Sequence, residues 1–304
     1  MSWRKLGFVY RPPGDRWWAR GYAHLPTPMR QGDGSIRVFF AALDDQKFGR
    51  IGYADVDPGN PLRVIRTSAE PVFDLGQPGA FDDSGVNPSC VVSVNGEPHM
   101  YYIGWQRLQR VPYALFAGLA KFDSTGGLER VSKAPVLDRT DREPFLRSAT
   151  SVLFDGGRYR AWYVSALDWI QVSGSPYPRY VVRHAESTDG FAWSDGGPVC
   201  IGHLGPDEFG IGRPWVVRDP DCYRMWYSIR SRTAPYCIGY AESPDGLAWT
   251  RRDELVGIGV SAEGWDSEMI CYPAVIDAGG RRLMFYNGNR HGATGFGAAV
   301  WEEG

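Results

Sequence analysis

The chain has 304 residues, 43 % of them hydrophobic and 14 % aromatic, and its formal net charge at pH 7 is −2. This near balance of charges argues against a broad basic surface for nucleic acid or for an acidic membrane. The length suffices for one large core and the composition does not shift abruptly, so we expect a single domain over residues 1–304.

The N-terminal segment, residues 3–10 (WRKLGFVY), is strand-like and lies outside the repeated pattern described next. The first residues contain no apolar core of a signal peptide, and no apolar run approaches the length of a membrane span. The 5 cysteines are dispersed without C-x-x-C spacing, as is typical of free thiols in a reducing compartment. These features favour a cytoplasmic protein.

After this segment the chain repeats one unit five times. Each unit has a short apolar run, a tight turn rich in Asp, Asn and Gly, a strand with two adjacent aromatic residues, and a further run that contains an Ala. Because neighbouring side chains alternate faces of a strand, both rings can pack between adjacent sheets. The aromatic pairs are Phe39-Phe40, Tyr101-Tyr102, Trp162-Tyr163, Trp226-Tyr227 and Phe285-Tyr286. The alanines are Ala54, Ala120, Ala185, Ala241 and Ala298.

This periodicity predicts an all-β fold, a five-bladed β-propeller with four antiparallel strands per blade. The fifth unit ends in AAVWEEG (298–304) without a fourth strand, and residues 3–10 are left over. We therefore expect the N-terminal strand to complete the last blade and close the propeller, which removes an exposed sheet edge.

Two phrases, VRHAESTDGFAW (182–193) and IGYAESPDGLAW (238–249), are nearly identical. The Asp side chain of such a turn accepts backbone N–H groups, Gly takes a positive φ, and Trp covers the hairpin. The turn resembles the Asp-box of sialidase-type propellers, one residue shorter. We interpret it as structural and expect the chemistry where the units differ.

The units differ most at the start of each first strand, which in a propeller lines the central channel. Charged groups that face one another across a funnel favour a polar ligand and perturbed pKa values. In the alternative interpretation they pair with one another and fill the channel with salt bridges. The residues are Arg20, Tyr22, His24, Asp82, Asp83, Asn87, Glu143, Arg147, Glu208, Arg213, Asp266, Glu268 and Tyr272.

The chain resembles the five-bladed glycosidase-like propellers, which are glycoside hydrolase families 32, 43, 68 and 130 and their unassigned bacterial relatives. The likeness spans essentially the whole chain and concerns the fold more than the reaction. It implies an enzyme with two carboxyl groups flanking an anomeric carbon, which acts by hydrolysis, phosphorolysis or glycosyl transfer on a small sugar, including anionic sugars and sugar phosphates. The residues that carry the likeness are FDDSGVNPS (81–89), MWYS (225–228), YAESPDGLAW (240–249) and WDSEMICYP (265–273).

Carried over to this chain, the resemblance implies Glu208 as the proton donor, with Asp83 or Glu268 as the base. The hydrolytic families usually have an Asp-Pro in the first blade, whereas this chain has AHLPTP (23–28), with His24 and no acid. Either Asp83 or His24 then replaces the missing acid, or the protein does something else with a sugar.

Arg147 and Arg213 stand at the starts of two first strands. Two Arg side chains can hold a carboxylate or a phosphate through bidentate hydrogen bonds, which predicts an acidic sugar, a sugar phosphate or a nucleotide sugar. In the alternative interpretation, each Arg pairs with Glu143 or Glu208.

Loops near the channel supply further candidates for contacts with a sugar. The glycine-rich segment 286–297 brings two Asn side chains near the mouth, and the insertions at 105–113 and 166–180 should overhang one side with aromatic rings and one further acid. The predicted substrate-binding residues are His24, Asn87, Trp105, Arg147, Asp168, Trp169, Arg213, Tyr272, Asn287 and Asn289.

No spacing of His or Cys residues indicates a metal site, and no motif points to a cofactor, so we expect neither. The expected partner is a small-molecule carbohydrate, and not a nucleic acid or a membrane. The competing functions are a non-catalytic sugar-binding or scaffold propeller and a non-glycosidic enzyme on the same fold.

Overall fold

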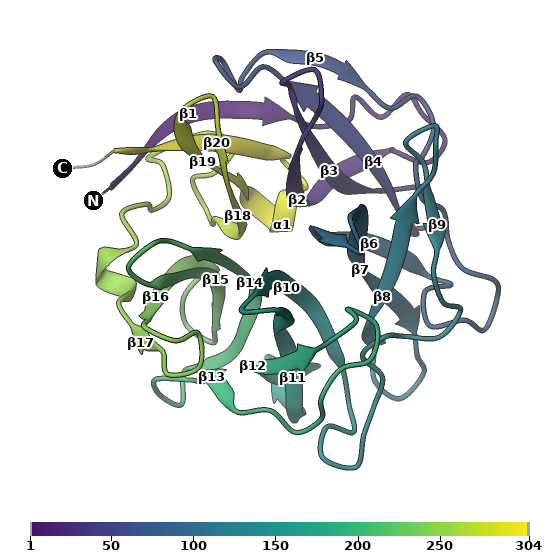
Figure 1. The fold of residues 1–304 in the computed structure, drawn as a ribbon, viewed down its shortest axis with the longest axis vertical. Helices are drawn as coiled ribbons and strands as arrows, with labels where there is room; N and C mark the ends of the chain where they lie inside the picture. Colours follow the sequence, from purple (N-terminus) through teal and green to yellow (C-terminus); the bar gives the residue numbers. More distant parts are fainter. Residues whose placement is uncertain (1, 303–304) are drawn as a thin grey trace.

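The computed structural model describes residues 2–302, which form a nearly all-β fold (Figure 1). Helix in this range is confined to a 3₁₀ turn, η1 (Asp253–Leu255), and to the four-residue α1 (Asn289–Gly292). Within residues 2–302, no helix has the length and apolar character that crossing a membrane requires.

The strands form consecutive antiparallel groups of four. Group 1 contains β2 (Gly21–Arg30), β3 (Ile36–Leu43), β4 (Gly49–Val56) and β5 (Val64–Thr67). Group 2 contains β6 (Gly85–Val94), β7 (Glu97–Arg107), β8 (Tyr113–Phe122) and β9 (Leu128–Arg130). Group 3 contains β10 (Arg147–Asp155), β11 (Arg158–Val172), β12 (Ser175–Ser187) and β13 (Val199–Ile201).

Group 4 contains β14 (Glu208–Arg218), β15 (Tyr223–Ser231), β16 (Cys237–Ser243) and β17 (Thr250–Arg251). Group 5 contains β18 (Cys271–Ala278), β19 (Arg281–Asn287), β20 (Phe296–Glu302) and the N-terminal β1 (Ser2–Tyr10). Figure 1 shows the groups arranged around a common centre, with the first strand of each group nearest to it. Single parallel pairs join the third strand of one group to the first strand of the next, at Gly49–Gly85, Phe116–Arg147 and Tyr180–Gly210.

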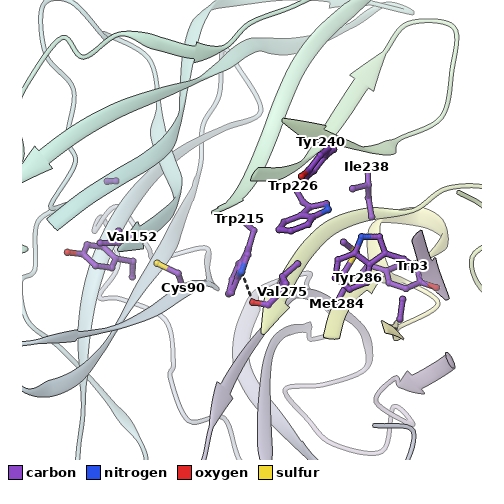
Figure 2. Packing of buried hydrophobic residues seen from close by; sticks show 14 of the residues in the cluster. Trp3, Cys90, Val152, Trp215, Trp226, Ile238, Tyr240, Val275, Met284 and Tyr286 are labelled. Carbon is purple, nitrogen blue, oxygen red and sulfur yellow. Dashed lines mark hydrogen bonds between the residues drawn. The ribbon is translucent and has the colours of Figure 1, made fainter. Parts of the chain in front are cut away.

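The N-terminal strand lies on the outer edge of group 5. β1 pairs antiparallel with β20 from Ser2 opposite Glu302 to Tyr10 opposite Phe296, so the first and last described residues lie side by side (Figure 1). Its Trp3 is 4 % exposed and belongs to the buried cluster drawn in Figure 2. The Trp3 ring meets those of Trp226 and Trp301 edge to face, at centroid distances of 5.7 and 4.8 Å. This contact joins the first strand of the chain to the core between groups 4 and 5.

The ten rings of the aromatic pairs form the cores of the groups, as predicted, since none of them is more than 1 % exposed. In four groups the second ring is a tyrosine, and its hydroxyl donates a hydrogen bond to a carboxylate: Tyr102 to Asp82, Tyr163 to Glu143, Tyr227 to Asp253 and Tyr286 to Asp266. Three of these acids, Asp82, Glu143 and Asp266, stand at the starts of first strands. Their place is therefore within the packing of the groups.

The two repeated Asp-Gly turns have the same internal geometry. The Asp189 and Asp245 carboxylates each accept two backbone N–H groups of the following residues, at 2.8 and 2.9 Å in the first turn and at 2.8 Å in the second. Gly190 and Gly246 adopt φ values of 78° and 76°. Hydrogen bonds to these residues favour the ionised form, and the pKa of both carboxyls is lowered.

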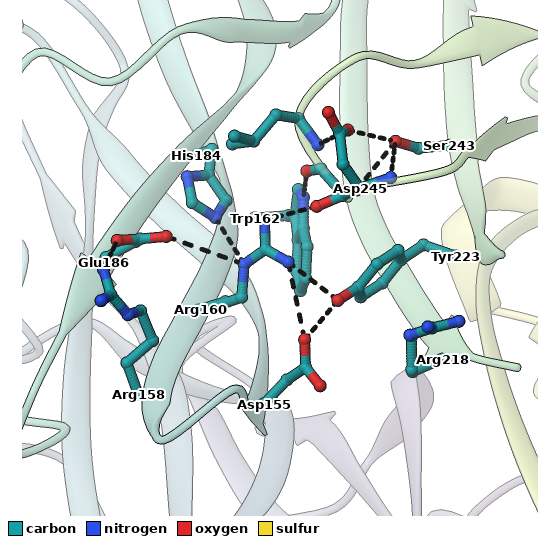
Figure 3. A network of polar contacts seen from close by, with 12 residues as sticks. Asp155, Arg158, Arg160, Trp162, His184, Glu186, Arg218, Tyr223, Ser243 and Asp245 are labelled. Carbon is teal, nitrogen blue, oxygen red and sulfur yellow. Dashed lines mark hydrogen bonds and ion pairs between the residues drawn. The ribbon is translucent and has the colours of Figure 1, made fainter. Parts of the chain in front are cut away.

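Each of these turns also binds the preceding group. Trp162 Nε1 donates to the Gly246 carbonyl oxygen, and Tyr101 donates to that of Gly190 in the same way. Around the second turn, the buried Arg160 donates to the Asp245 carbonyl oxygen at 2.7 Å and to the Tyr223 hydroxyl at 2.9 Å (Figure 3). The repeated phrase therefore holds neighbouring groups together.

All five first strands carry an irregularity at an equivalent place. The pairing with the second strand shifts within β2 between His24 and Thr27, and corresponding shifts occur in β6, β10, β14 and β18. A bulge bends a strand and redirects a side chain, and bulges gather next to active sites. Here they lie at the end of the channel where the first strands converge.

Candidate functional site

A cavity of about 690 Å³ lies where the five first strands converge. Every first strand contributes to its lining. The contributing residues are Tyr22, His24 and Leu25 from β2, Gly85 and Asn87 from β6, Ser148 and Ala149 from β10, Gly212 and Arg213 from β14, and Tyr272 from β18.

The backbone around this cavity is strained. Ten non-glycine residues in the described range have a positive φ, and eight of them line the cavity. Such conformations are costly and collect at functional sites, where the surrounding structure holds them. The observation marks this end of the channel as the candidate site independently of its chemistry. The eight residues are Tyr22, Leu25, Lys47, Ala149, Arg213, Tyr272, Arg290 and His291.

Aromatic rings make up much of the wall. Trp105 lies 4.7 Å from Tyr113, ring centroid to ring centroid, and Tyr22 stacks on His24 at 4.6 Å. Tyr236 meets His291 edge to face at 4.8 Å. Flat rings at a cavity wall can stack on the apolar face of a sugar ring. Tyr177 and Tyr180 line the cavity as well.

The charged side chains of the lining all have one sign. Five are cationic, and no Asp or Glu of the described range borders the cavity. The lining therefore offers many hydrogen-bond donors and no side chain that only accepts, so it complements a ligand rich in acceptor oxygens, such as a phosphate or a carboxylate. The cationic residues are Lys47, Arg107, Arg213, Arg230 and Arg290.

Arg213 and Arg147, which the sequence paired as anion binders, differ in their surroundings. Arg147 lies outside the cavity lining, 3.5 Å from Glu143, and donates to the Asp138 carbonyl oxygen at 2.8 Å. Arg213 borders the cavity and has no carboxylate within 4.0 Å among residues 2–302; its Nη2 donates to Thr27 Oγ1 at 2.8 Å. Burial lowers the pKa of Arg213 to about 10. The alternative of an internal pair thus holds for Arg147 and not for Arg213.

Arg230 is a lining residue that the sequence analysis missed. It lies on β15 opposite Gly210, and its guanidinium stands over the rings of Tyr177 and Phe209 at 4.2 and 5.0 Å. No carboxylate in the described part of the chain lies within salt-bridge distance of it. The missed signal was positional, because the end of the second strand lies beside the start of the first strand in every hairpin of this kind.

Two histidines face the cavity from opposite ends of the chain, His24 from β2 and His291 from α1. Burial, and then the proximity of His291, lowers the pKa of His24 to about 4. Burial, and then the charge of Arg230, lowers the pKa of His291 to about 4. Both imidazoles are therefore neutral near pH 7 and able to accept a proton or a hydrogen bond.

The three acids predicted to be catalytic lie outside the cavity lining. Glu208 accepts two hydrogen bonds from Arg251, at 2.7 and 2.9 Å, and one from the Leu204 N–H. Asp83 accepts hydrogen bonds from the Gly79 N–H and from Ser84 Oγ. Glu268 is exposed. We expected these acids to line one funnel with Arg147 and Arg213. Of these five residues only Arg213 borders the cavity described here, and local donors hold Glu208 and Asp83 elsewhere.

The remaining predicted residues divide into two sets. Asn87, Trp105 and Tyr272 line the cavity with His24 and Arg213. Asn287 and Asn289 are buried and use their side-chain amides on backbone groups, so they shape the segment around α1 instead of facing the cavity. Asp168 pairs with Arg179, and Trp169 packs against Tyr113 at 5.7 Å; neither lines the cavity.

Neither thiols nor metal ligands form a recognisable centre. The 5 cysteines are free, and the described residues contain no group of three or more His, Cys, Asp or Glu side chains placed to hold a metal ion.

No known protein-family model matches the chain. It is 39 % identical over 302 residues to the Mycobacterium tuberculosis protein described as "Uncharacterized protein Rv1502", and the alignment covers 99 % of this chain and 100 % of that protein. The Mycobacterium tuberculosis protein MT1551 shows the same identity and coverage.

Several solved structures with the same fold are described as glycoside hydrolases. One described as a glycoside hydrolase superimposes with a TM-score of 0.75 at 20 % identity and covers 98 % of this chain and 90 % of its own. A thermostable family-43 glycoside hydrolase superimposes with a TM-score of 0.67 at 15 % identity, and the match covers 96 % of this chain and 91 % of that one. A structure from the GH130 family superimposes with a TM-score of 0.69 at 15 % identity, and the match covers 99 % of this chain and 94 % of that one. That family of mannoside phosphorylases is described as containing glycoside hydrolases that target β-1,2 mannosidic linkages in Candida mannan. The chain thus has the fold of the glycosidase-like propeller proteins.

Proposed function

The chain belongs to the family of the mycobacterial protein Rv1502, and we propose that it is a carbohydrate-active protein that takes a small anionic sugar in the cavity at the end of the channel. The observation that carries this proposal is the cavity lining, which has five cationic side chains, several aromatic rings and, among residues 2–302, no carboxylate. Rings suit the faces of a sugar, and guanidinium groups suit its anionic substituent.

The proposal includes an architecture. We take the five antiparallel groups as the blades of a single-domain propeller over residues 1–304, closed by β1 against β20. Closure of this kind removes the free edge of the last sheet and keeps the channel rigid. The 5 free cysteines are consistent with a cytoplasmic location in this proposal.

A binding function without turnover is the second candidate, and the position of the acids favours it. Glycosidic cleavage needs two carboxyl groups on either side of the scissile bond. Glu208 is neutralised by Arg251, and neither Asp83 nor Glu268 borders the cavity. An enzyme of this type would have to bring one of these acids to a sugar bound at the mouth.

Binding by isothermal titration calorimetry tests the main proposal. The panel contains a hexose phosphate, a hexuronate, a neutral hexose and a β-1,2-mannobiose, the last because of the GH130 neighbour. We expect the anionic sugars to bind. Arg230→Gln should lower their affinity by about tenfold or more, since charge-assisted hydrogen bonds contribute about 1.5–3 kcal/mol.

Arg232→Gln is the matched control, because Arg232 directly follows the last residue of β15, is exposed and does not line the cavity. Equal weakening by both variants, or binding of neutral sugars alone, would contradict the proposal. Product analysis after long incubation, with and without phosphate, then separates an enzyme from a binding protein.

A further inference from the structure

Arg213 is a buried cation without a counter-ion. Its side chain is 1 % exposed, and its Nε and Nη1 have no hydrogen-bond partner. No carboxylate of residues 2–302 lies within 4.0 Å of it. Burial of a charge without a partner is among the most costly arrangements in a protein. Stability therefore does not explain a buried, unpaired Arg at the edge of a cavity, whereas binding of an anion there would.

Arg147 provides the contrast within the same fold. It is 3 % exposed and occupies the start of β10, as Arg213 occupies part of β14. Arg147 pairs with Glu143 and donates to Tyr163 and to a backbone carbonyl. The fold can therefore supply acidic partners for a buried guanidinium, and it does not do so at Arg213.

A second unpaired guanidinium lies near the first. Arg230 has aromatic neighbours and no carboxylate partner. Arg230 lies opposite Gly210, three positions before Arg213 on the neighbouring strand β14, and both arginines line the cavity together with Tyr272. Ser148 adds a buried hydroxyl without a hydrogen-bond partner to the same lining.

We propose that this part of the lining is a phosphoryl-binding subsite, in which Arg213 and Arg230 hold the phosphate group of the ligand. The inference rests on the proposed function in one respect, since it places the anionic group of that sugar. It also narrows the class of sugar, from anionic sugars in general to sugar phosphates.

The charge of the cavity distinguishes a phosphate from a carboxylate. Five cationic side chains line the cavity, and no Asp or Glu of residues 2–302 lines it with them. A dianion with three terminal oxygens engages two guanidinium forks, whereas a carboxylate fills one.

The test measures thermal stability and calorimetric binding of the full chain with four probes: inorganic phosphate, a hexose 6-phosphate, a hexuronate and a neutral hexose. Wild type should be stabilised by phosphate and by the hexose phosphate, because a ligand that binds only the native state raises its melting temperature. Arg213→Met should weaken both by at least tenfold. Without ligand, it should melt at a higher temperature than wild type, since it removes an unpaired buried charge.

Arg147→Met is the matched control and should melt at a lower temperature, because it removes the buried cation that pairs with the buried Glu143 carboxylate. If Arg213→Met does not fold, Arg213→Lys takes its place, because Lys keeps the positive charge but lacks the paired N–H donors of a guanidinium. Arg213→Lys should fold and bind phosphate more weakly than wild type. Unchanged phosphate affinity in a folded Arg213 variant, or a lower melting temperature of ligand-free Arg213→Met, would overturn the inference.

The outcomes also separate the two proposals. If wild type binds the hexuronate but neither phosphate probe, the phosphoryl subsite is wrong and the proposed function stands. If inorganic phosphate binds through Arg213 and no sugar binds, the subsite stands and the proposed function is wrong. Binding of the hexose phosphate without binding of inorganic phosphate places the phosphoryl group on the sugar.

Discussion

Trp162 Nε1 donates a hydrogen bond to the Gly246 carbonyl oxygen at 2.8 Å, from the second strand of group 3 to the Asp-Gly turn of group 4. The repeated turn is therefore a joint between neighbouring groups as well as the end of a hairpin. The neighbouring Arg160 reinforces the joint through the Asp245 carbonyl oxygen (Figure 3). Changes in this turn should act on stability and leave the cavity intact.

Gly246→Val should lower the free energy of unfolding by about 2–5 kcal/mol, from the positive φ and from overpacking together. A Cβ at position 246 would lie 3.0 Å from atoms of Arg160 and of Trp162, at a φ of 76°. Gly34→Val separates the two causes, because Gly34 has a φ of 86° and no atom within 4 Å of the added Cβ. Urea unfolding should show a smaller loss of unfolding free energy for Gly34→Val than for Gly246→Val. Equal losses would contradict the proposed role of the turn in the contact between groups 3 and 4.

Trp3→Ala should cost about 3–5 kcal/mol, the usual range for a buried Trp, because the ring fills the core between groups 4 and 5. Arg4→Ala on the same strand serves as the control. The Arg4 side chain is 57 % exposed and pairs with Glu302, and such surface pairs contribute at most about 1 kcal/mol. If Trp3→Ala unfolds at the same denaturant concentration as Arg4→Ala, β1 is not part of the core.

Glu208→Gln should destabilise the fold by about 1–3 kcal/mol and leave ligand affinity at the cavity unchanged, because it removes one half of a bidentate pair with Arg251. Arg251 keeps Asp253 as a partner, which limits the loss. Glu268→Gln should stay within about 0.5 kcal/mol of wild type, since Glu268 is exposed. A Glu208→Gln variant of normal stability that loses turnover on an identified substrate would restore Glu208 as the proton donor.

Stability should fall as the pH is lowered from about 6.5 towards 4. Burial depresses the pKa of His24 and of His291 from 6.5 to about 4, so in this range the unfolded chain binds protons that the native chain does not. Above pH 6.5 both states carry neutral imidazoles and the effect vanishes. His184, whose pKa burial also lowers to about 4, contributes in the same way.

His291→Gln should reduce the slope of unfolding free energy against pH between pH 5 and 6. The reduction should correspond to close to one proton fewer taken up on unfolding. The slope is informative even when the variant is less stable overall. His99→Gln is the control, because His99 does not line the cavity and its ring contacts the Glu97 carbonyl oxygen and Phe191. An unchanged slope for His291→Gln would show that this imidazole is protonated in the native state.

The repeated pattern of the chain could be predicted from the sequence because its causes are local. Side chains alternate along a strand, so adjacent aromatic residues such as Trp162 and Tyr163 fill both faces of a sheet. Gly190 and Gly246 occupy turns that require a positive φ, and Asp189 and Asp245 accept the N–H groups next to them. Each of these relations joins residues only a few positions apart.

The partner of each charged residue was decided only by the tertiary structure. Glu208 and Arg213 lie five positions apart on one strand, yet Glu208 pairs with Arg251 while Arg213 reaches Thr27 of β2. Arg147 forms an ion pair with Glu143, whereas Arg213 forms none with an acid of residues 2–302, although both lie on first strands. Ion pairs act through space over a few ångströms, so residues distant in the chain compete for each charge, and the bulges of the first strands decide which side chains reach the cavity.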